Sequence, residues 1–182
     1  GLVDASTASA LIMLIMTEFA NNNVQSLIGD GHTDGSTRIN TGSCDNVPGL
    51  TGRPAGTSNT VDVVWRGIEG FWGNCLEWLD GLNWNSGAYW VCNDQSSYAD
   101  STSTGYTQLG YTGGATNWST TYIKETGYDA ANAAYMLPIT GGGSGSSYYC
   151  DAVWSSPGWR VSARGGSNGV GTAAGLFALI MN

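Results

Sequence analysis

Residues 75–92 read CLEWLDGLNWNSGAYWVC, and this stretch decides how the middle of the chain folds. Aromatic and aliphatic residues, which favour strands, lie on both sides of an Asn-Ser-Gly sequence at 85–87. Asn, Ser and Gly are common in tight turns. The stretch therefore predicts a β-hairpin made of residues 75–84 and 86–93.

The hairpin belongs to a longer segment that carries five tryptophans between Trp65 and Trp90. A buried tryptophan removes roughly 150 to 250 Å² from water, so most of these rings are predicted to be scaffold. The ones that we expect to be buried are Trp65, Trp72 and Trp78. Those that we still allow at the surface are Trp84, Tyr89 and Trp90.

Hydrophobic spacing predicts helix at the N-terminus and strands after it. Apolar residues at helical spacing predict a helix over 7–23, capped by Asp4 or Ser6, and residues 24–29 predict a short second helix. A Gly-, Thr- and Asn-rich loop is expected over 29–59. Further short strands are predicted at 61–66, 133–139, 148–154, 159–166 and 174–182. This order predicts one domain over 1–182, of the α+β class, with N-terminal helices packed on short, mostly antiparallel strands joined by long loops.

Charge and hydropathy exclude several classes of function. The net charge is −8, and the six basic residues form no cluster, so neither nucleic acid nor an anionic membrane is expected as a partner. The longest apolar run, 11–16, is far shorter than the roughly 20 residues that cross a bilayer. Because the chain begins at Gly1, we expect it to be a segment of a longer protein.

The sequence predicts no metal site and no cofactor. Residues 30–35, DGHTDG, resemble the start of a calcium loop, but His32 takes a ligand position and Thr41 stands where the closing Glu belongs. The four cysteines lack the close pairs of a zinc site. We expect them to be buried thiols, with a Cys75–Cys92 disulfide as the alternative.

Glu69 and Glu77 lie among the tryptophans and raise a catalytic alternative. Two carboxylates beside aromatic rings suit a sugar substrate, with one as acid and one as base. Structural roles, as partners of Arg66 or of turn amides, remain the leading interpretation of both residues.

Two motifs carry a resemblance to a known family. Gly73, Asn74, Glu77 and Trp78, followed far downstream by Arg160, Val161, Arg164 and the Gly-Gly-Ser of 165–167, resemble the two signature strands of the formylglycine-generating-enzyme superfamily. This resemblance implies a C-type-lectin-like fold. The catalytic cysteine pair of that superfamily has no counterpart here, and Asn168 replaces the tryptophan that follows Gly-Gly-Ser. The resemblance therefore implies a binding module rather than an enzyme.

Within that superfamily the chain is most similar to phage and bacterial receptor-binding domains, including the variable proteins of diversity-generating retroelements. Such proteins vary near the C-terminus, where mutagenesis turns asparagine codons into others. The resemblance implies retained residues at Asn168 and Asn182 and substituted ones at Gly171, Ala173, Ala178 and Ile180, although an ordinary Gly- and Ala-rich strand remains an alternative. The complete set of expected ligand-binding residues is Tyr148, Tyr149, Trp154, Trp159, Asn168, Gly171, Ala173, Ala178, Ile180 and Asn182.

The resulting expectation is an adhesin or receptor-binding domain at the tip of a phage tail fibre, in the virion, or on a bacterial cell surface. Its partner would be a bacterial surface protein or glycan, bound without calcium, and the full-length protein is a possible homotrimer whose display adds avidity. Two alternatives stay open. One is a glycan-active enzyme that uses Glu69 and Glu77, and the other is a structural virion or pilus component without a ligand.

Overall fold

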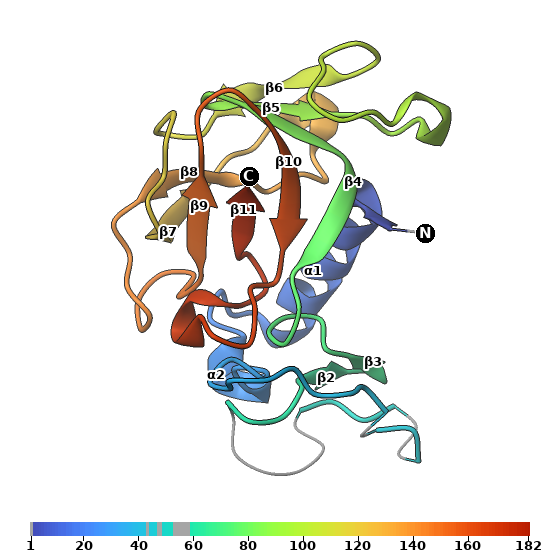
Figure 1. The fold of residues 1–182 in the computed structure, drawn as a ribbon, viewed down its shortest axis with the longest axis vertical. Helices are drawn as coiled ribbons and strands as arrows, with labels where there is room; N and C mark the ends of the chain where they lie inside the picture. The colour runs from blue at the N-terminus through green and yellow to red at the C-terminus, as the bar shows by residue number, and fades with distance from the viewer. Residues whose placement is uncertain (1, 43, 47–48, 53–58) are drawn as a thin grey trace.

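The computed structural model describes residues 2–42, 44–46, 49–52 and 59–182. Strand accounts for 30% of the structure and helix for 16%. The only long helix among the described residues is α1 (Ala5–Phe19), which lies behind a curved sheet in Figure 1. The short helical elements are α2 (Gln25–Ile28), η1 (Gln95–Ser97), η2 (Ala130–Asn132) and η3 (Gly171–Ala173).

One large sheet, nearly closed like a barrel, forms most of the molecule. Its strands, in spatial order, are β6 (Thr107–Thr112), β5 (Ala88–Val91), β4 (Glu77–Asn85), β10 (Trp159–Arg164), β11 (Leu179–Met181), β9 (Ala152–Ser155), β7 (Thr121–Thr126) and β8 (Pro138–Gly141). β1 (Val3–Asp4) adds to β4 in parallel, and β11 also pairs in parallel with β9. The other pairings are antiparallel, including a separate ribbon of β2 (Val64–Trp65) and β3 (Ile68–Glu69).

The predicted α+β class, with N-terminal helices packed on the strands, is wrong. Only α1 is long enough to cover part of the sheet, since α2 has four residues. Four residues make about one helical turn, which buries too little surface to form a layer. The chain after α2 instead satisfies its backbone by pairing strands that are distant in sequence, so the fold is mostly β.

Several local predictions are confirmed. α1 begins after Asp4, whose side chain accepts a hydrogen bond from Thr7 N at 2.8 Å, but it ends at Phe19 and does not extend to residue 23. α2 is capped by Gly29 as expected. The hairpin of 75–84 and 86–93 appears as β4 and β5. In the loop predicted over 29–59, the described part contains one isolated bridge, Gly52 to Val64. Residues 43, 47–48 and 53–58 of that loop lie outside the described residues.

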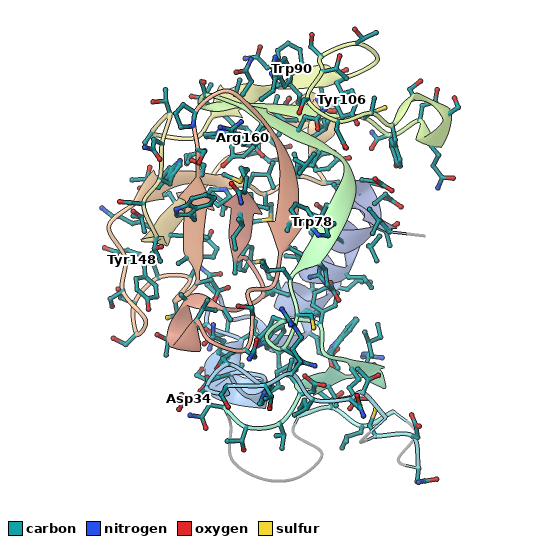
Figure 2. The ribbon with its side chains drawn as sticks, in the orientation of Figure 1. Asp34, Trp78, Trp90, Tyr106, Tyr148 and Arg160 are labelled. Carbon is teal, nitrogen blue, oxygen red and sulfur yellow. The ribbon has the colours of Figure 1, made fainter. Side chains whose placement is uncertain are left out.

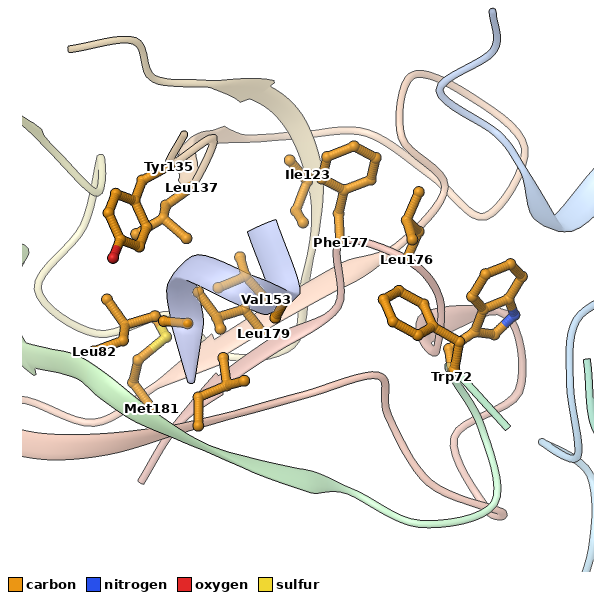
Figure 3. Close-up of a cluster of buried hydrophobic side chains, with 14 of the residues drawn as sticks. Trp72, Leu82, Ile123, Tyr135, Leu137, Val153, Leu176, Phe177, Leu179 and Met181 are labelled. Atoms are coloured by element: carbon orange, nitrogen blue, oxygen red, sulfur yellow. The ribbon is translucent and has the colours of Figure 1, made fainter. Parts of the chain in front are cut away.

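The core lies between α1 and the inner face of the sheet, as Figure 3 shows for ten labelled side chains. Trp65 and Trp72 are buried as predicted. Three other predictions about burial in this tryptophan-rich segment are wrong. Trp78 is 46% exposed instead of buried, whereas Trp84 and Tyr89, which were allowed at the surface, are fully buried.

A bulge in β4 explains these exchanged positions. Ser162 of β10 pairs with Leu79, but the preceding Val161 pairs with Asn83, so β4 contains extra residues between them. In a regular strand Trp78, Leu82 and Trp84 would share a face. The bulge reverses the alternation of side chains between the two faces of the sheet. Leu79 and Leu82 therefore both point into the core, and Trp78 points outward.

Candidate ligand-binding face

A row of apolar side chains crosses the outer face of the sheet. Trp78 of β4 pairs in register with Ala163 of β10, Ala163 with Ile180 of β11, and Ile180 with Trp154 of β9. Directly paired residues point to the same face of a sheet. We call the row of Trp78, Ala163, Ile180 and Trp154 the outer row.

The neighbours of the outer row define which face it occupies. Leu79, Val153, Leu179 and Met181 are adjacent to it along the strands and belong to the buried core, whereas no member of the outer row does. The same core contains residues of α1, so the core lies on the α1 side of the sheet, and Figure 2 labels Trp78 beside β4. The outer row therefore lies on the opposite face from α1.

A hollow of about 410 Å³ lies at one end of the outer row. Its lining comes from β9, β11, the loop that contains η3 and the residue before β7, and none of the described lining residues is charged. Thr120 supplies its only side-chain hydroxyl. The lining residues are Thr120, Ala152, Val153, Trp154, Gly166, Val170, Ala173, Ala178 and Ile180.

A second hollow, of about 210 Å³, lies at the opposite end beside Trp78. Two carboxylates, Asp80 and Asp100, line it, and none of the described residues that line it is basic. Within the part of the chain that the structure describes, neither carboxylate forms an ion pair. The remaining lining residues are Leu2, Trp78, Leu79 and Val161. We call the first hollow the apolar hollow and the second the acidic hollow.

Four of the ten predicted ligand residues, Trp154, Ala173, Ala178 and Ile180, line the apolar hollow. Tyr148 is 53% exposed elsewhere, with the Lys124 ammonium 5.6 Å from its ring centre. The structure thus brings only part of the predicted set together.

The other predicted residues make contacts within the fold. The Tyr149 ring packs edge-on against Phe177, with centroids 4.7 Å apart, and Trp159 packs against Trp90 at 5.8 Å. The side chain of Asn168 donates to Gly35 O at 2.8 Å. The backbone N–H groups of the last two, Gly171 and Asn182, donate to Thr33 O and Val161 O.

Sequence reasoning missed one end of the face. Trp78 was assigned to the core, and Asp80, Asp100 and Val161 were not among the expected ligand-binding residues. Gly81, in the Leu-Asp-Gly-Leu sequence at 79–82, could have indicated the bulge in β4, because a glycine inside a strand pattern is typical of a bulge. The size of the bulge, and hence the direction of Trp78, depends on the pairing with β10.

Glu69 and Glu77 both have structural partners. Arg164 donates from Nη2 to Glu77 Oε2 at 2.5 Å, and its guanidinium carbon lies 3.6 Å from the Phe71 ring centre. Burial lowers the pKa of Arg164, and the Glu77 carboxylate opposes that shift. Glu69 accepts from Gly42 N at 2.6 Å.

Comparison with known proteins adds no family: no family model and no curated protein matches the chain. Among the described residues, no three His, Cys, Asp or Glu side chains are grouped so that they could hold a metal ion. A helix long and apolar enough to cross a membrane is also absent from the described ranges. The function must therefore be inferred from the chain's own residues, and the family resemblance stays a prediction.

Proposed function

We propose that this chain is a receptor-binding domain that recognises a bacterial surface receptor through the outer face of β4, β10, β11 and β9. The proposed setting is the tip of a phage tail fibre or a bacterial cell surface. One observation carries this proposal: an apolar cross-strand row, with a hollow at each end, lies on the face of the sheet opposite the core. Contiguous apolar surface of this kind marks interaction sites in soluble proteins.

The sheet makes this face a rigid platform. The members of the outer row lie on four neighbouring strands, with Ala163 fully buried between the larger side chains. Trp78 and Trp154 have few rotatable bonds, so fixing them in a complex costs little entropy. A platform of this type binds without first having to fold or close.

The positions suggested for retroelement mutagenesis also support the proposal. Ala173, Ala178 and Ile180, which were expected to be substituted, line the apolar hollow. Asn168, which was expected to be retained, holds the loop through three hydrogen bonds with Gly35 and Asn74. Gly171 has a φ of +55°, a conformation that Asn and Gly tolerate best. An exchange of Asn for Gly at that position would preserve the backbone.

The proposal is tested by adsorption of the fluorescently labelled chain to a panel of intact bacterial cells. Ile180→Asp places a charge in the middle of the outer row, and Val170→Asp places one at the 40% exposed residue beside η3. Both variants should lose adsorption. Tyr128→Ala removes an aromatic residue that is 72% exposed and lines neither hollow, so it should bind normally.

Thermal unfolding of each variant separates lost binding from lost folding, and Val170→Asp leaves the sheet itself unchanged. Adsorption that survives in folded samples of both variants contradicts the proposal. Hydrolysis of a glycan that stops in a folded Glu77→Gln variant would support the enzyme alternative instead.

A further inference from the structure

We propose that the outer face binds a polypeptide segment that places one apolar side chain in the apolar hollow and one lysine or arginine in the acidic hollow. This inference rests on the proposed function and specifies the chemistry of the receptor. It selects a protein receptor over a glycan, a choice that the proposed function leaves open.

The composition of the apolar hollow disfavours a sugar. A sugar can stack the C–H face of its ring on an aromatic side chain, but it carries several hydroxyls around its rim, and each one that is buried without a hydrogen-bond partner is penalised. Among the described residues of the lining, the only side-chain polar groups are the Thr120 hydroxyl and the Trp154 indole N–H, and Val170 and Ile180 supply apolar surface. An aliphatic or aromatic side chain loses no hydrogen bonds when it enters such a hollow.

The acidic hollow has the complementary chemistry for a cation. The Trp78 indole is 46% exposed, and the face of an aromatic ring carries negative electrostatic potential. Asp80 and Asp100 add two carboxylates that form no ion pair within the described residues. The chain as a whole has a net charge of −8, which attracts a basic segment over a longer range. A lysine ammonium or an arginine guanidinium can contact the ring and a carboxylate together.

The spacing of the two hollows sets the spacing of the two side chains. Trp78 lies beside one hollow and Trp154 beside the other, on strands that are separated by β10 and β11, so three strand intervals of 4.7–4.9 Å place their backbones about 14 Å apart along the sheet. In an extended chain, residues i and i+4 point to the same side and are also about 14 Å apart. The expected segment therefore presents an apolar residue and a basic residue four positions apart, in either direction.

Selection of a random-peptide display library against the chain tests this inference, with a bacterial glycan array probed in parallel. Enriched peptides should carry an apolar residue and Lys or Arg four positions apart. Asp80→Asn combined with Asp100→Asn should weaken the enriched peptide by about tenfold, with the loss shrinking at high salt. Ile180→Asp should abolish binding.

Asp45→Asn combined with Glu125→Gln is the matched control, because it removes two exposed carboxylates from outside both hollows and changes the net charge equally. This control should leave peptide binding unchanged. Enriched peptides without a basic residue, or equal weakening by the two double variants, would overturn the inference.

The outcomes also separate this inference from the proposed function. Binding of glycans but not peptides, lost on Ile180→Asp, would refute the polypeptide ligand and leave the outer face as the binding site. Adsorption to cells that survives both Ile180→Asp and Val170→Asp would refute the proposed function itself.

Discussion

Arg164 and Glu77 join two motifs that are far apart in the sequence. Arg164 is almost fully buried, with 4% of its side chain exposed, and its Nη2 lies 2.5 Å from the Glu77 carboxylate. The segments that precede β4 and follow β10 are also linked, because Gly73 N donates to Gly165 O and Asn168 N donates to Asn74 O. These contacts fix the position of β10 on β4 and, with it, the outer row.

Glu77→Gln should lower the free energy of unfolding by about 2 kcal/mol. The reason is that a buried guanidinium is left without its charge partner, although Glu77 is 37% exposed, so solvent reduces the penalty. Urea unfolding measures the loss. Adding Arg164→Met to that variant removes the buried charge and should restore much of the stability. If the double variant were less stable than Glu77→Gln alone, the charge would not be the cause.

Gly81→Ala should destabilise the fold by about 3 kcal/mol. Gly81 has a φ of +75°, and a Cβ there would lie 2.6 Å from Cys92 O, so left-handed strain and a steric clash add together. Gly49→Ala is the matched control, since Gly49 has a φ of +72° but no atom of the described residues within 4 Å of an added Cβ. Its cost should be only the strain of about 1 kcal/mol, as compared by thermal or urea unfolding.

Asp62 should make stability depend on pH. Burial, reinforced by Glu69 and opposed by His32, raises the pKa of Asp62 to about 6, and neither of its oxygens has a hydrogen-bond partner in the part of the chain that the structure describes. The unfolded chain has a value near 3.9, so the folded state holds the proton more tightly. The stabilisation from Asp62 is therefore present below about pH 4 and is lost as pH rises towards 6, by about 2 to 3 kcal/mol.

Asp62→Asn is the variant that tests this dependence. Its stability relative to the unchanged chain should rise between pH 4 and pH 6 and stay constant above that range. Urea midpoints across the range provide the measurement. A constant difference between the two proteins would show that Asp62 titrates alike in the folded and unfolded states.

The cysteines should react as four free thiols of unequal access. Cys75 is exposed, and Cys44, Cys92 and Cys150 are buried. Burial raises the pKa of Cys150, which slows its reaction further. A thiol reagent should therefore modify Cys75 quickly in the native protein and all four cysteines in denaturant. Fewer than four reactive thiols in denaturant would instead support the Cys75–Cys92 disulfide.

Local features of the fold were predictable from the sequence, because short-range physics determines them. Helical spacing and the Asp4 cap define α1, and the Asn-Ser-Gly turn at 85–87 defines the hairpin of β4 and β5. The sequence also predicted strands at 75–84 and 159–166, which correspond to β4 and β10. The class of the fold could not be predicted in this way, because it depends on how many strands join one sheet and on α2 being a single turn.

Only the apolar end of the candidate binding face could be predicted from the sequence. Trp154, Ala173, Ala178 and Ile180 lie close together in the C-terminal part of the chain, where the resemblance placed the variable residues. The acidic hollow combines Leu2, residues 78–80, Asp100 and Val161, which are distant in sequence. No local pattern predicts such a combination, since long-range strand pairing creates it.

The sequence by itself determined the N-terminal helix and the hairpin, which depend on neighbouring residues, and the acidic charge, which depends on composition. The tertiary structure alone decided which side chains face outward. The face of every residue in β4 depends on where the strand pairs with β10, and the bulge at Gly81 changes that register. For that reason Trp78 lies on the proposed binding face and Trp84 lies in the core.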